Sequence, residues 1–147
     1  MNSNKDINIL ILSAGRGLGI DGFHKLKLIY PKSEENILER YQRQFGKKIV
    51  IVVGYHAAEL MSSYPKLEYK YNYLWHETGS AFSAYIGMHE VPVLIMPSDL
   101  IIDDNSINEI LSEKGNVVFG KESENRKKSS ISIISEKEEL KGIYTGA

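Results

Sequence analysis

The sequence predicts a three-layer α/β fold, in which a mostly parallel sheet carries helices on both faces. Short runs such as Ile7–Leu12 and Lys48–Val53 are apolar on both faces, as strands buried in a parallel sheet are. Amphipathic segments with helical spacing alternate with these runs. Right-handed crossovers then place the carboxyl ends of the strands at one edge of the sheet, where ligands bind in such folds.

The strands are predicted from their apolar pattern and from the turn residues around them. Leu67–Tyr71 alternates as an edge strand does, whereas the others are short, nearly continuous apolar runs. The predicted strands are Ile7–Leu12, Lys48–Val53, Leu67–Tyr71, Val91–Met96 and Asn116–Gly120, followed by a hairpin of Ser130–Ser135 and Leu140–Tyr144.

The helices are predicted from the spacing of their apolar residues and from their ends. The first is expected to begin at Glu34, with Ser33 as its cap and two acids in its first turn, and to end at Gly46. The other predicted helices are His56–Tyr64, Gly79–Glu90 and Ser106–Leu111, the last of them capped by Asn105.

The bulk properties indicate one domain over residues 1–147. The net charge of −1 argues against nucleic acid as a partner. The sequence contains no cysteine, which excludes disulfides and thiolate metal sites. The apolar run Ile7–Leu12 is too short to cross a bilayer, so we expect a cytoplasmic protein with no membrane partner.

The loop after the first strand carries the most informative pattern. Gly15, Gly17 and Gly19 lie within a few residues of one another, and glycines let backbone N–H groups converge on a phosphate. Arg16 adds a guanidinium for phosphate oxygens, and Lys25 adds a point charge. The spacing matches neither the Walker motif nor the dinucleotide motif. By spacing alone, a flexible loop with a solvent-facing arginine is the alternative.

Leu12–Gly19, followed by His24-Lys25-Leu26, resembles the opening of nucleotidyltransferases of the sugar-phosphate and phosphocholine cytidylyltransferase type. Gly15 and Gly17 match the two glycines of that motif, and Lys25 matches its signature lysine. The resemblance implies a Rossmann-like (GT-A-like) fold. The usual arginine of the motif falls on Gly19, so Arg16 is the candidate to replace it. Lys27 is an alternative to Lys25.

The resemblance extends over residues 7 to 120. Ile49–Tyr55 resembles the second strand of these enzymes, and Met96–Asp99 resembles the strand end with their metal-binding aspartate. Asn72 and Thr78–Ala81 resemble the segment that reads the nucleobase. The resemblance implies that the nucleotide-binding residues are Ser13, Ala14, Gly15, Gly17, Gly19, Tyr55, Asn72, Thr78, Gly79 and Ser80.

Asp99 and Thr78–Ala81 can also be interpreted from their residue types and positions alone. A carboxylate after a buried strand can hold Mg²⁺ against triphosphate oxygens, or it can cap the following turn. Gly79 would let a base approach the backbone, or Thr78 could simply cap a helix. Asp103 and Asp104 are expected at a helix N-terminus rather than at a metal.

Together these features predict a magnesium-dependent nucleotidyltransferase, with Lys25 and Arg16 as catalytic residues and Asp99 as the metal ligand. The expected partners are a nucleoside triphosphate, with CTP favoured, and a small phosphorylated acceptor; a homodimer stays open. One alternative is a sugar-1-phosphate nucleotidyltransferase that makes precursors of surface polysaccharide. Another is a shortened, non-catalytic nucleotide-binding module that lacks the acceptor-binding part, because no aspartate follows Asp104.

Overall fold

The four parallel strands lie in the first of two compact units, Met1–Ile107 and Asn108–Ala147. The single domain expected from the sequence stays a prediction. The computed structural model describes residues 7–17, 22–29, 33–46, 48–88, 92–115, 117–119, 131–137 and 139–145.

The sheet of the first unit has the strand order β3-β2-β1-β4, and every neighbouring pair is parallel. The chain moves outward from β1 to β2 and β3, then returns to place β4 on the other side of β1. The strand order therefore reverses between β1 and β4, where α/β sheets commonly bind ligands. The strands are β1 (Asn8–Ser13), β2 (Ile49–Val53), β3 (Glu68–Tyr71) and β4 (Val93–Pro97).

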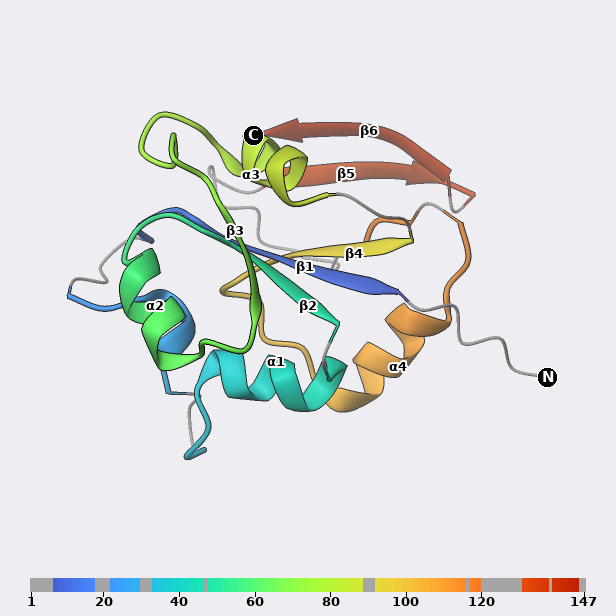
Figure 1. Cartoon of the computed structure of the whole chain (residues 1–147). Helices are drawn as coiled ribbons and strands as arrows, with labels where there is room; N and C mark the ends of the chain where they lie inside the picture. The colour runs from blue at the N-terminus through green and yellow to red at the C-terminus, as the bar shows by residue number, and fades with distance from the viewer. Residues whose placement is uncertain are drawn as a thin grey trace. The chain divides into compact units, whose positions relative to one another are not determined.

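Helices α1 (Ile37–Phe45) and α3 (Ser80–Gly87) cover opposite faces of this sheet (Figure 1). Helix α3 lies close to the strands because Gly87 has no side chain. A Cβ atom there would stand 2.5 Å from Leu10 Cδ1 and 2.6 Å from Val52 Cγ2. The predicted Rossmann-like α/β fold, with helices on both faces of a parallel sheet, is confirmed. The remaining helices are α2 (Ala57–Ser63) and α4 (Asp104–Ser112).

Helix α1 begins later than the sequence suggested, and Ser33 does not cap it. Asn36 is the cap: its Oδ1 accepts from the Glu39 N–H at 2.9 Å, and Glu39 Oε2 accepts from the Asn36 N–H at 2.9 Å. This reciprocal pair satisfies two N–H groups at the end of the helix. Ser33 Oγ instead accepts from the Glu35 N–H in the preceding turn. The predicted end at Gly46 is confirmed.

Two predictions near the second unit are wrong. Asp103, not Asn105, caps α4, because its Oδ1 accepts from the backbone N–H groups of Asn105 and Ser106. Residues 117–119, within the strand predicted at Asn116–Gly120, form no strand and are exposed. An apolar run becomes a strand only where a neighbouring strand takes up its backbone groups, and none of the described strands pairs with this segment.

The second unit contains the predicted hairpin. Strands β5 (Ile131–Glu136) and β6 (Glu139–Thr145) pair antiparallel, with Ile133 opposite Ile143. Lys137 lies in the turn with a φ of 50°, a left-handed conformation that tight turns often require.

Candidate functional site

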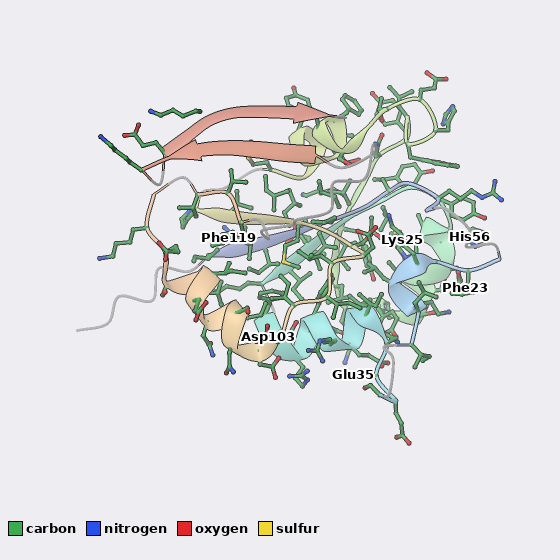
Figure 2. All side chains as sticks on the ribbon, turned by 180° about the vertical axis from the view of Figure 1, so that it is seen from behind. Phe23, Lys25, Glu35, His56, Asp103 and Phe119 are labelled. Atoms are coloured by element: carbon green, nitrogen blue, oxygen red, sulfur yellow. The ribbon has the colours of Figure 1, made fainter. Side chains whose placement is uncertain are left out.

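The predicted site residues come together at the carboxyl edge of the four-stranded sheet. The glycine loop follows β1, Tyr55 follows β2, Asn72 follows β3 and Asp99 follows β4. Lys25 opens η1 (Lys25–Lys27), a single 3-10 turn after the glycine loop. Figure 2 shows Lys25 and His56 at the same end of the sheet. Gly19 lies outside the described residues.

Lys25 and Asp99 interact electrostatically at this edge. Burial lowers the pKa of the half-buried Lys25 ammonium below its ordinary 10.5, and the negative charge of Asp99 partly restores it. The two residues follow β1 and β4, between which the strand order reverses. The structure therefore places the predicted phosphate-binding lysine and the predicted metal-binding aspartate after neighbouring strands.

His24 holds the turn that carries Lys25. Its ring is 1% exposed, its Nδ1 accepts from the Leu26 N–H at 3.3 Å, and its Nε2 lies 3.5 Å from Ser13 Oγ. Burial and the Lys25 charge lower the pKa of His24 to about 4, so the ring is neutral at pH 7. An Nδ1 that accepts places the proton on Nε2, which donates to Ser13. Ser13 is itself buried, and its predicted nucleotide contact stays a prediction.

Glu59 on α2 is a residue that sequence reasoning missed. One carboxylate oxygen accepts from the His24 N–H at 2.9 Å, and the other accepts from Lys27 Nζ. His56 Nδ1 lies 3.4 Å from the same carboxylate. The Lys27 ammonium, followed by the His24 N–H, lowers the pKa of Glu59. Because Lys27 is held by Glu59, Lys25 is the better candidate for phosphate contact.

The described part of the glycine loop is exposed. Gly17 has a φ of 75°, a conformation that favours glycine, and Gly15 has open space where a side chain would stand. The Arg16 guanidinium carbon lies 5.9 Å from the centre of the Tyr55 ring. The rings of Tyr55 and Trp75 pack in a T-shaped arrangement, with their centres 5.4 Å apart. The predicted residues Arg16 and Tyr55 thus form one cluster, to which the structure adds Trp75.

Gly54 and Ala14 set the distance between the glycine loop and the loop after β3. The Tyr55 N–H donates to the Ala14 carbonyl at 2.8 Å. A Cβ atom on Gly54 would stand 2.8 Å from that carbonyl and 2.5 Å from the Trp75 Cβ. Only glycine fits between the Ala14 carbonyl and Trp75. The ends of β1 and β2 and the loop after β3 therefore lie against one another and form one surface.

Asn72 organises the loop that was predicted to read a nucleobase. Its side chain is buried: Nδ2 donates to Thr78 Oγ1 at 3.0 Å and to Ser83 Oγ at 3.1 Å, and Oδ1 accepts from the Leu74 N–H at 2.9 Å. Thr78 also donates to the Leu74 carbonyl. Gly79, not Thr78, is the N-terminal cap of α3. Asn72 and Thr78 therefore shape the loop, while Gly79 and Ser80 are exposed.

The carboxylates near β4 separate into two groups. Asp103 caps α4, and Asp104 accepts from Arg43 at 3.1 Å and from Gln44 at 2.8 Å, as expected for a helix N-terminus. Asp99 instead interacts with Lys25. Within the described ranges, no three His, Cys, Asp or Glu residues are grouped to hold a metal. One carboxylate completed by phosphate and water nevertheless suits Mg²⁺, so Asp99 fits the role.

A cavity of about 260 Å³ lies elsewhere, where the strands begin and α3 ends. None of the predicted site residues lines it; Glu68 and Lys70, an ion pair at 3.3 Å, do. No described helix is long and apolar enough to cross a membrane. No model of a known protein family matches the chain, and no curated protein matches it.

Proposed function

We propose that this chain binds a nucleoside triphosphate with Mg²⁺ and transfers its nucleotidyl group to a small phosphorylated acceptor. The observation that carries the proposal is the placement of Lys25 after β1 and of Asp99 after the neighbouring strand β4, beside an exposed glycine loop. A cation for phosphate, a carboxylate for Mg²⁺ and converging backbone N–H groups are what a bound triphosphate requires.

In the proposed reaction an acceptor phosphate oxygen attacks the α-phosphorus, and the bond from that phosphorus to the pyrophosphate oxygen breaks. The acceptor is already an anion, so no general base is needed. The protein must hold two anions together and offset their charge. Lys25 contacts the α-phosphate and the acceptor phosphate, while Arg16 and the loop N–H groups hold the β- and γ-phosphates. Mg²⁺ held by Asp99 would neutralise charge on the phosphate oxygens.

The favoured nucleotide is CTP, with the exposed segment Gly79–Ser80 beside its base and Tyr55 beside its ribose or base. Asn72 supports this assignment indirectly, because its three hydrogen bonds hold the loop that leads to Gly79. In this arrangement Asn72 fixes the shape of the base site, and the backbone around Gly79 supplies the contacts. Replacing Asn72 would then disturb base selection without removing a direct contact.

A thermal-shift measurement with each of the four nucleoside triphosphates and Mg²⁺ tests binding. A ligand at 100 times its Kd stabilises a protein by about 2.7 kcal/mol, which raises the Tm visibly. We expect the largest shift with CTP, and loss of that shift in Lys25→Ala and Asp99→Asn. Lys66→Ala, an exposed lysine on the turn after α2, is the matched control. Absence of a shift with every nucleotide contradicts the proposal.

Pyrophosphate release with a set of phosphorylated acceptors tests turnover. The proposal expects release with wild type and Lys66→Ala, and strongly reduced release with Lys25→Ala. Unchanged release in Lys25→Ala or Asp99→Asn would contradict the assigned roles. A chain that binds CTP and never releases pyrophosphate is instead a nucleotide-binding module.

A further inference from the structure

The turn that carries Asp99 is fastened to helix α1 by a buried tyrosine. The Tyr41 hydroxyl donates to the Leu100 carbonyl and lies 3.4 Å from the Pro97 carbonyl. These two carbonyls stand on either side of the Ser98–Asp99 turn. One hydroxyl therefore reaches both ends of the short segment from which the Asp99 side chain extends.

Tyr41 is well placed to act as a fixed point. Its side chain is 1% exposed, and its ring packs against Phe45 with the ring centres 6.1 Å apart. Burial and the charge of Asp99 both raise the pKa of Tyr41, so the hydroxyl keeps its proton and stays a donor. Asn36 caps the helix that carries it. Tyr41 thus holds the Ser98–Asp99 turn at a fixed position relative to α1.

Two neighbours on α1 hold the same segment slightly farther along. Arg40 Nη2 donates to the Ile102 carbonyl at 3.2 Å, and Gln44 Nε2 donates to that carbonyl at 2.9 Å. Residues 40, 41 and 44 lie on adjoining positions of the helix surface. Among these contacts, those of Tyr41 are nearest in sequence to Asp99. Helix α1 therefore holds the segment after β4 through these contacts, and β1 holds its start, where the Ser98 N–H donates to the Leu12 carbonyl at 3.2 Å.

We propose that Tyr41 is a positioning residue that sets where the Asp99 carboxylate stands, and thereby the metal affinity of the site. The inference rests on the proposed function, since it concerns the carboxylate assigned to Mg²⁺. A site with one protein carboxylate has no second protein ligand to correct a displacement. Small shifts of such a group are costly, so the support beneath the turn decides the geometry.

Tyr41→Phe removes the hydroxyl and keeps the ring. The matched control is Tyr69→Phe, because the Tyr69 hydroxyl also donates to a backbone carbonyl, that of Tyr64, at 2.9 Å. Hydrogen exchange of peptides covering residues 97–103 measures the hold on the turn. Paramagnetic resonance of Mn²⁺ in the presence of CTP measures metal affinity. Urea unfolding of both variants measures the general cost of losing one buried hydroxyl.

We expect Tyr41→Phe to exchange about fivefold faster over residues 97–103 and to bind Mn²⁺ with CTP about fivefold more weakly, the effect of one net hydrogen bond. Tyr69→Phe should change neither. Equal exchange in the two variants overturns the inference, and so does faster exchange with unchanged Mn²⁺ affinity. If wild type and Asp99→Asn bind Mn²⁺ with CTP equally, the proposed function fails, whereas the exchange comparison still reports whether Tyr41 holds the turn.

Discussion

Acidification should destabilise this protein through His24. The buried ring has a pKa of about 4 in the folded protein, against an ordinary value of 6.5 that applies to the unfolded chain. Between these values the unfolded state binds a proton that the folded state does not. Unfolding is therefore favoured as the pH falls below 6.5, and the stability is fully present above that pH.

The magnitude follows from the size of the shift. Each pKa unit corresponds to about 1.36 kcal/mol, so the full shift from 6.5 to about 4 is worth about 3 kcal/mol. At pH 5 about 2 kcal/mol of this is already lost, because the unfolded histidine is charged there and the folded one is still neutral. That is a large share of the 5–15 kcal/mol by which domains are usually stable.

Urea unfolding between pH 7.5 and 5 measures this loss, with His24→Asn as the comparison. Asparagine does not titrate, and its oxygen can accept the Leu26 N–H that His24 Nδ1 accepts. Carboxylates with lowered pKa values, such as Glu59 and Asp103, stay ionised above pH 5 and cancel in the comparison. We expect wild type to lose about 2 kcal/mol more than His24→Asn over this range. Parallel curves would refute the reasoning.

Four further substitutions test the packing around the site and the cap of α1 by chemical unfolding. Gly54→Ala should cost about 1–3 kcal/mol, because its Cβ would overlap Trp75; a neutral effect would mean that the two loops separate easily. Asn72→Ala should cost about 1–3 kcal/mol of stability, because the Leu74 N–H and Ser83 lose their partner. Loss of CTP selectivity with unchanged stability would contradict this structural role. Asn36→Ala should cost about 1 kcal/mol as a lost helix cap, while Ser33→Ala should cost less.

The sheet could be predicted from local patterns. Ile7–Leu12 and Lys48–Val53 are apolar on both faces because β1 and β2 lie inside the sheet with neighbours on both sides. Leu67–Tyr71 alternates in sequence and β3 is indeed an edge strand, but its burial does not alternate, because Glu68 and Tyr71 are exposed. Strand β4 is the other edge strand although its sequence is a continuous apolar run, so the apolar pattern predicts the strands better than their places in the sheet.

Contacts between distant residues were not predictable in the same way. Glu59 binds the turn of His24 across 35 positions of sequence, and nothing in the residues around either one indicates the other. The helix cap is different, because the spacing of Asn36 and Glu39 is itself a sequence signature of a capping box and favours Asn36 over Ser33. The apolar pattern at 117–119 lacks the partner strand that the prediction assumed.

The candidate site depends both on local sequence patterns, which could be predicted, and on the pairing of distant strands, which could not. The alternation of strands and helices predicts that Lys25 and Asp99 share one edge of the sheet, but not that they are neighbours. The strand order decides this: β4 pairs with β1. Had β4 instead paired with the outer side of β3, it would stand three strand spacings, ~14 Å, from β1. The reversal in strand order is therefore what makes Lys25 and Asp99 follow neighbouring strands, and the proposed nucleotide site depends on that reversal.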